Sequence, residues 1–220
     1  MIPKILHWIW LGDSPPSIVL DNVATWKAVY PDWEIKFHGN EILKRYTLPS
    51  IIKEAIFYKR WALVSDYIRL KVLFEWGGVY CDGDIKHLKP FSNDMLDNDF
   101  FIFSSHYDKR DKYIPVSDYC FASNKETKIV QLLIDRYDTL KPNTIIYKLT
   151  IGFVLIAAYI YGYVIAQHYD FFYDINKTFL FEDNIVIYPN YKLTSINFYN
   201  NYIEDKSQTF AVHLKFSTLP

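Results

Sequence analysis

Apolar positions along the chain recur at two spacings, which predict alternating strands and helices. Short runs of β-branched and aromatic residues bounded by turn residues predict strands within residues 3–12, 33–38, 79–88, 99–106 and 208–216. Apolar residues three or four positions apart predict helices over residues 21–30, 51–76 (in two pieces) and 125–139. The opening strand, helix and strand predict an α/β unit, and sheets of this kind bind ligands at the carboxyl ends of their strands.

One uncharged apolar segment runs from Ile151 to Ala166. It is shorter than the roughly 20 apolar residues that a membrane span needs, and two glycines and three tyrosines interrupt it. We therefore expect a buried helix, with contact to a membrane surface as the alternative. Because the chain has no internal repeat or Gly/Ser linker, we expect a single domain over residues 1–220.

Composition narrows the classes of protein. Among 220 residues, 24 Lys and Arg nearly balance 25 Asp and Glu, which argues against a nucleic-acid partner. Cys81 and Cys120 form no pair motif, so we expect a reducing compartment rather than a disulfide framework or zinc site. The N-terminal residues lack the long apolar run of a signal peptide. Aromatic residues make up 19% of the chain, and some of these rings are expected to line a cleft for sugars or bases.

Candidate chemistry centres on Asp82-Gly83-Asp84. If the triplet is an extended strand, both carboxylates point to one face, about 6 to 7 Å apart. Gly83 would then let a ligand approach the backbone. Carboxylates of this kind hold Mg²⁺ or Mn²⁺ together with substrate phosphates. The alternative is a solvated turn, because Asp and Gly are common turn residues.

Two neighbouring features favour a ligand site. Asp66 and Arg69 lie three positions apart, on one face of the predicted helix. They form either a simple ion pair or a pair that holds phosphate and sugar hydroxyls. Trp10 ends the first predicted strand, where its ring either stacks on a nucleobase or packs into the core.

Taken together, these features resemble the DXD-containing glycosyltransferases of family 32. The resembling stretches are residues 2–12, 25–35, 59–90 and 209–217. The family includes transferases for capsular polysaccharide and lipooligosaccharide and yeast outer-chain mannosyltransferases, with the glucosylating domains of large clostridial toxins as distant relatives. The resemblance implies a retaining transferase with the nucleotide-binding α/β sandwich called GT-A. Residues to about 100 would bind the nucleotide-sugar, and the rest would form the acceptor-side and closing part.

The resemblance also implies roles for single residues. Asp84 would hold Mn²⁺ or Mg²⁺ directly, and Asp82 would contact the sugar or ribose, and the metal through water. Arg69 would bind sugar or phosphate. The other implied donor contacts come from Tyr80, Asp66, Gly83, the ring of Trp10 and the backbone near Ile9 and Leu11.

The tail would contribute His213 or Ser217 to the metal or the diphosphate. It departs from the family, because Thr218-Leu219 stands where the family has a tryptophan. A second departure is Gly152-Phe153 in place of Gly-Pro. The missing tryptophan concerns how the tail closes the site.

The resulting expectation is transfer of a hexose, glucose or galactose, from a UDP-sugar to a glycan or lipid-linked glycan. We expect a cytoplasmic protein, with peripheral contact to the inner membrane face as an addition. Asp118 and Asp183 are the carboxylates that a double displacement would use instead of front-side attack. Within the family, the alternatives are a GDP-mannose donor or a protein acceptor, as in the toxins.

Two other classes remain as alternatives: a hydrolase, either a phosphatase or a glycosidase, and a binding module without activity. A phosphatase of the haloacid-dehalogenase type also has a D-x-D motif, but near its N-terminus and without a lysine at the position of Lys86. A glycosidase needs two carboxylates in unequal environments. A sugar-binding or membrane-contact module without activity would bind its ligand without the two aspartates.

Overall fold

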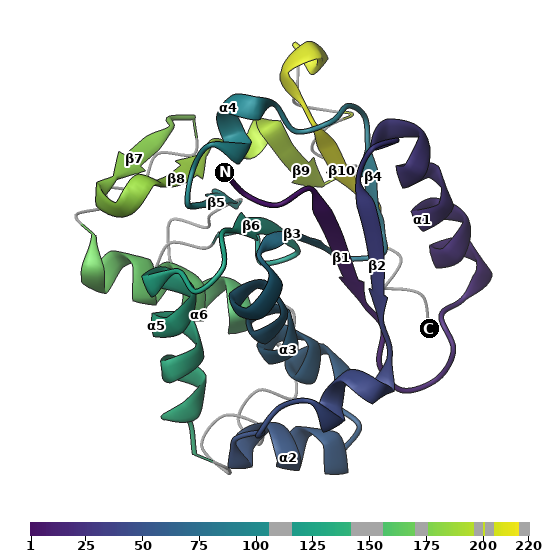
Figure 1. Cartoon of the computed structure of the whole chain (residues 1–220), viewed down its shortest axis with the longest axis vertical. Coiled ribbons are helices and arrows are strands. Elements are labelled where there is room, and N and C mark those ends of the chain that lie inside the picture. Colours follow the sequence, from purple (N-terminus) through teal and green to yellow (C-terminus); the bar gives the residue numbers. More distant parts are fainter. Residues whose placement is uncertain (106–115, 142–155, 170–175, 196–199, 201–204, 216–220) are drawn as a thin grey trace.

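The computed structural model describes residues 1–105, 116–141, 156–169, 176–195, 200 and 205–215 (Figure 1). The strands are β1 (Ile5–Ile9), β2 (Glu34–His38), β3 (Gly78–Cys81), β4 (Ile85–His87), β5 (Phe100–Phe103), β6 (Cys120–Ser123), β7 (Phe179–Phe181), β8 (Ile185–Tyr188), β9 (Leu193–Ser195) and β10 (Ala211–His213). The α-helices are α1 (Ser17–Val29), α2 (Ser50–Phe57), α3 (Trp61–Trp76), α4 (Asn93–Leu96), α5 (Lys128–Asp138) and α6 (Ile156–His168). Short 3₁₀ turns lie at Asn40–Lys44, Glu182–Asn184, Asn190–Lys192 and Lys206–Gln208.

Seven strands form a mixed sheet in the order β2-β1-β3-β6-β5-β8-β7. β1 pairs in parallel with β2 and β3, so the predicted strand–helix–strand opening is confirmed. β6 is antiparallel to both β3 and β5, which makes the sheet mixed. A smaller sheet has the order β4-β10-β9, and it brings the end of the chain back to the segment after β3.

Both faces of the large sheet are buried along its central strands β3, β5 and β6, where the side chains alternate between two apolar cores. Along β5, Phe100 and Ile102 point into one core, and Phe101 and Phe103 point into the other. Helices α3, α5 and α6 pack on the first face, and α1 with the small sheet packs on the second. Figure 1 shows these two layers on opposite sides of β1 and β3. A strand buried on both faces reads as a continuous apolar run, as the sequence of β5 does.

The helices confirm most of the expected pattern. The stretch predicted as two helical pieces forms α2 and α3, and Gly77 ends α3 with φ of 66°, a conformation that favours glycine. The apolar stretch predicted as a buried helix is α6 from residue 156, and its Tyr161 and Ile165 are fully buried. Residues 151–155 lie outside the described part of the chain.

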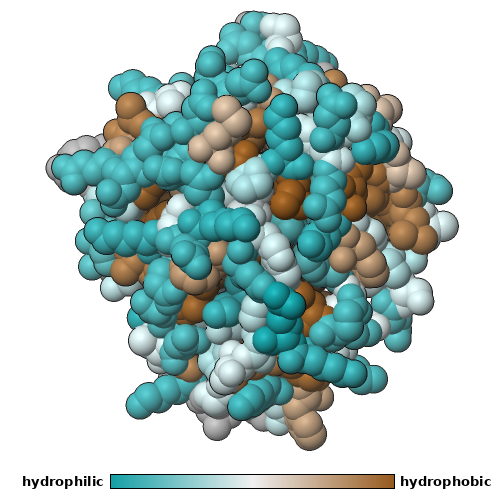
Figure 2. Space-filling view, in the orientation of Figure 1, coloured by the Kyte–Doolittle hydropathy of each residue, from teal (hydrophilic) through white to brown (hydrophobic). Residues whose placement is uncertain are grey.

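Within the described residues, no helix has both the length and the apolar character to cross a membrane. On the face shown in Figure 2, apolar residues reach the surface in separate groups between hydrophilic residues. Cys81 and Cys120 face each other across β3 and β6 as free, buried thiols.

Candidate active site

The Asp82-Gly83-Asp84 triplet forms a turn between β3 and β4, and the expectation of an extended strand is wrong. β3 ends at Cys81, and the Ile85 N–H donates to the Asp82 carbonyl at 3.0 Å, which closes the turn. The chain turns here because β3 and β4 belong to different sheets. The turn nevertheless lies where predicted, at the carboxyl end of a strand parallel to β1.

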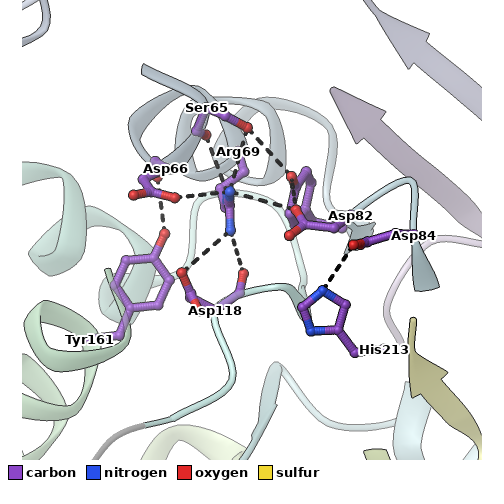
Figure 3. Close-up of polar contacts among 9 residues, drawn as sticks. Ser65, Asp66, Arg69, Asp82, Asp84, Asp118, Tyr161 and His213 are labelled. Carbon is purple, nitrogen blue, oxygen red and sulfur yellow. Dashed lines mark hydrogen bonds and ion pairs between the residues drawn. The ribbon is translucent and has the colours of Figure 1, made fainter. Parts of the chain in front are cut away.

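The turn and the end of the chain bring three metal-ligand side chains together. Ligand atoms of Asp82, Asp84 and His213 all lie within 4.8 Å of one another. β10 pairs with β4 so that His213 faces Ile85, and His213 Nε2 lies 3.1 Å from Asp84 Oδ2 (Figure 3). The His213 ring stacks on Tyr119 at 4.4 Å, which orients the imidazole.

Arg69 lies beside this group and meets three aspartates (Figure 3). Its Nη2 is 2.9 Å from Asp66 Oδ1 and 3.6 Å from Asp82 Oδ1. Its Nη1 donates to the Asp118 carbonyl at 2.7 Å and lies 3.7 Å from the Asp118 carboxylate. The predicted pairing of Asp66 with Arg69 is confirmed, and the pair is buried in the floor of the site.

Tyr80 contacts both Asp82, in the metal-ligand group, and Arg69. Its hydroxyl donates to Asp82 Oδ1 at 2.5 Å, and its ring lies 4.5 Å below the guanidinium carbon of Arg69. Tyr161 on α6 donates to the backbone carbonyl of Asp66 at 3.0 Å. These contacts hold the carboxylates in place from α3, α6 and the strand ends.

Among the described residues, the site carries more carboxylate charge than Arg69 compensates. Burial raises the pKa of Asp66 to about 8 and that of Asp118 to about 6, although Arg69 acts in the opposite direction. Burial also raises the pKa of Asp82, again against Arg69, and the neighbouring Asp84 adds to the increase. Without a further positive charge, burial therefore disfavours the ionised forms of these three aspartates.

A divalent cation fits this donor set. Two carboxylates and one imidazole converge with their ligand atoms within 4.8 Å of one another, and oxygen-rich sets of this kind suit Mn²⁺ and Mg²⁺. A cation there would also supply the positive charge that the aspartates lack. The residues that the sequence assigned to the metal are thus brought together.

The residues that we expect to bind the nucleotide lie at the end of β1 and directly after it. The segment 9–12 leaves the sheet at the same edge as Asp82, with Ile9 and Leu11 buried and Trp10 half-buried. Asn40 holds this segment because its side chain accepts from the Gly12 N–H and donates to the Gly12 carbonyl, both at 2.8 Å. Base stacking by Trp10 stays a prediction.

Two other predicted residues have different outcomes. A Cβ at Gly83 would lie 2.7 Å from Val19 Cγ1, so this glycine is required by packing against α1. The expectation that Gly83 lets a ligand approach the backbone stays a prediction. Ser217 lies outside the described residues, as do Gly152-Phe153 and Thr218-Leu219.

The sequence missed several members of the site. Tyr119 and Tyr161 carried no spacing signal, because both reach the site through tertiary packing. Ser65 lies on α3 four residues before Arg69, so helical spacing could have indicated its contact. Of the two alternative carboxylates, Asp118 lies against Arg69. Asp183 instead lies on an exposed turn, 3.9 Å from Lys128 Nζ.

Solved structures define the class of fold. The chain is similar to the PaToxG glycosyltransferase, with a TM-score of 0.57 and 15% identity over 76% of this chain and 70% of that one. It is also similar to a glycosyltransferase involved in glycosylation of the major capsid of PBCV-1 (TM-score 0.50, 14% identity, 97% and 94% covered). An active-site mutant of LgtC gives a TM-score of 0.50 at 11% identity, with 95% and 86% covered. The predicted GT-A class of fold is confirmed.

The family follows from the sequence itself. The chain belongs to the capsular polysaccharide synthesis protein family, whose model matches residues 2–217. No curated protein matches the chain in sequence. The family and the fold together place the chain among the glycosyltransferases, as the sequence predicted.

Proposed function

We propose that this chain is a metal-dependent, retaining glycosyltransferase that moves a hexose from a UDP-sugar to a hydroxyl of a glycan acceptor. The observation that carries the proposal is the convergence of Asp82, Asp84 and His213 beside the buried Arg69. The family supports an acceptor in the synthesis of surface polysaccharide. Glucose and galactose are the donor sugars that we propose first.

Asp84, Asp82 and His213 would hold Mn²⁺ or Mg²⁺, which supplies positive charge for the diphosphate leaving group when it is bound. Asp66 and Arg69 would face the donor as a fixed pair, because Asp118 and Ser65 restrain the guanidinium. A restrained charge stabilises a developing charge without reorganisation. Tyr80 would keep Asp82 oriented through its 2.5 Å hydrogen bond.

Retention is most simply explained by attack on the face from which the diphosphate leaves. The acceptor oxygen forms a bond to the anomeric carbon while the bond between that carbon and the β-phosphate oxygen breaks. The acceptor proton passes to the β-phosphate oxygen, and UDP departs. Asp118 would act in this route by orienting Arg69 through the 2.7 Å contact to its carbonyl.

The direct test measures UDP release from UDP-glucose and UDP-galactose by the purified protein. With Mn²⁺ we expect slow hydrolysis of one donor, and a chelator should abolish it. Asp84→Ala should lower the rate at least about 100-fold, because the site loses a ligand and the charge that holds the cation. The released sugar or the transfer product should keep the anomeric configuration of the donor.

Asp183→Ala is the matched control, since it removes a carboxylate on an exposed turn that pairs with Lys128. This variant should keep the wild-type rate. Full activity of Asp84→Ala with Mn²⁺, or equal losses in both variants, would overturn the proposal. An inverted product would overturn the front-side route alone.

A further inference from the structure

A buried asparagine on α1 contacts the metal-binding turn from behind. Asn22 is 8% exposed and lies on the inner face of α1, which also carries the buried Val19, Val23 and Trp26. Its Nδ2 donates to the Gly83 carbonyl and to the Ile85 carbonyl, both at 2.9 Å. Because both partners are acceptors, the amide must present its nitrogen and use both of its hydrogens.

These two carbonyls flank Asp84. Asn22 therefore fixes the peptide unit that precedes Asp84, the residue that we propose as the direct metal ligand, and the peptide unit that follows Ile85. Trp26, one helical turn later, adds a third bond from Nε1 to the Ile85 carbonyl at 2.8 Å. The Asp84 carbonyl is held from the other side by the Leu214 N–H at 2.9 Å.

The packing of α1 leaves the turn little room to move. Val19 Cγ1 lies so close to Gly83 that an added Cβ would approach to 2.7 Å. The same face of α1 thus contacts the turn sterically through Val19 and orients its backbone through the hydrogen bonds of Asn22. An asparagine on an otherwise apolar face loses favourable hydration, which its two hydrogen bonds to the turn offset.

We propose that Asn22 is a positioning residue for the metal site: it holds the Asp82–Asp84 turn so that both carboxylates converge with His213. It touches neither metal nor substrate, and it acts through the backbone of the turn. Groups that orient a metal's ligands change metal affinity about 10- to 100-fold when they are removed. The inference rests on the proposed function, because it requires that the cluster binds a divalent cation.

The test measures Mn²⁺ binding to the whole protein, by the loss of the free-ion signal in electron paramagnetic resonance. Asn22→Ala should raise the Mn²⁺ Kd about 10- to 100-fold, because the turn loses both hydrogen bonds. Asn22→Ser, whose hydroxyl retains one donor, should give a smaller increase. If Asn22→Ala does not fold, the Asn22→Ser variant alone decides the question.

Asn98 provides a matched control. It is also 8% exposed, and its Nδ2 donates to the Met95 carbonyl and to the Tyr188 hydroxyl, both at 3.0 Å, away from the metal cluster. Asn98→Ala should lower the melting temperature as Asn22→Ala does but leave the Mn²⁺ Kd at the wild-type value. A purely structural role for Asn22 predicts the same Kd in both variants and in the wild type, and that result would overturn the inference.

The outcomes separate this inference from the proposed function. If the wild type binds no Mn²⁺, or if Asp84→Ala binds it normally, the proposed metal site itself is wrong. If the wild type binds Mn²⁺, Asp84→Ala does not, and both Asn22 variants bind like the wild type, only the role of Asn22 is wrong.

Discussion

Two buried polar clusters differ in charge: one is built on β1 and β2, and the other on α3 and the segments next to β3 and β6. In the first, His7 Nδ1 lies 2.9 Å from His38 Nε2, His7 Nε2 lies 2.9 Å from the Gly77 carbonyl, and Trp76 packs against both rings. Burial lowers the pKa of His7 to about 3 and that of His38 to about 4, so both are neutral at pH 7. In the second, Asp66, Asp82 and Asp118 surround Arg69, and burial raises their pKa values.

The difference distinguishes a structural cluster from a functional one. The histidine pair closes its hydrogen bonds within the protein and needs no charge. The aspartate cluster is also hydrogen-bonded, but its negative charge exceeds what Arg69 supplies. Excess buried charge destabilises a fold, and strongly shifted pKa values of this kind are typical of functional sites. We infer that the excess negative charge is kept for a cation, through which a diphosphate would bind.

The largest effect should follow from removing the counter-charge. Arg69→Gln leaves buried carboxylates without a cation, so we expect a loss of about 3 to 5 kcal/mol in the free energy of unfolding. Urea unfolding in the presence of a chelator measures it. His38→Phe, which leaves His7 Nδ1 unpaired, should cost less, about 1 to 3 kcal/mol. Equal losses would remove the contrast between the clusters.

The two clusters should also respond to pH in opposite directions. The folded state keeps a proton on Asp66 up to about pH 8, whereas the unfolded chain releases it near 3.8, so this group lowers stability as pH rises between those values. The unfolded chain protonates its histidines below about pH 6.5, and the folded state rejects these protons until pH 3 to 4. The histidine pair therefore lowers stability as pH falls. Each group contributes up to about 1.4 kcal/mol per pH unit.

Asp66→Asn separates these contributions. In chelator, the stability of the variant should no longer decline as pH rises from 6.5 to 8. As pH falls below 6.5, the variant should lose stability more steeply than the wild type. Urea unfolding across this range measures both slopes. Parallel curves for wild type and variant would show that the folded state does not raise the pKa of Asp66.

A smaller effect should follow from moving the acidic turn without changing its charge. Gly83→Ala places a Cβ against Val19, and overpacking of this kind costs about 1 to 3 kcal/mol. Adding Val19→Ala should recover part of the stability, because it removes the methyl group that clashes. A double variant whose loss equals the sum of the single losses would contradict the contact.

The sequence predicted the first half of the chain better than the second. Strands and helices to Trp76 follow from local apolar spacing and from Pro and Gly at their ends. β6 (Cys120–Ser123) has four residues and no polar alternation, because both of its faces are buried, so its antiparallel place between β3 and β5 has no local signal. The strands β7 and β9 were also missed, because each has only three residues and so shows no clear alternation.

The site was predictable to the extent that its residues are close in sequence. Asp82, Asp84, Asp66 and Arg69 lie on adjoining segments, and their spacing indicated a shared site. His213 was expected only from the family resemblance, and it reaches Asp84 from 129 residues away through the pairing of β10 with β4. Asn22 and Asp118 act through backbone carbonyls, which side-chain patterns do not reveal.

The central claim is that the aspartates of the site, Asp84 included, bind a cation. The stability of Asp84→Asn with and without Mn²⁺ tests this claim most directly. Urea unfolding of wild type and variant is measured in chelator and then with Mn²⁺ at about 100 times the wild-type Kd. We predict that the variant is at least as stable as wild type in chelator, and that Mn²⁺ stabilises the wild type by about 2.7 kcal/mol and the variant by almost nothing. A variant that is less stable in chelator and equally stabilised by Mn²⁺ would contradict the account.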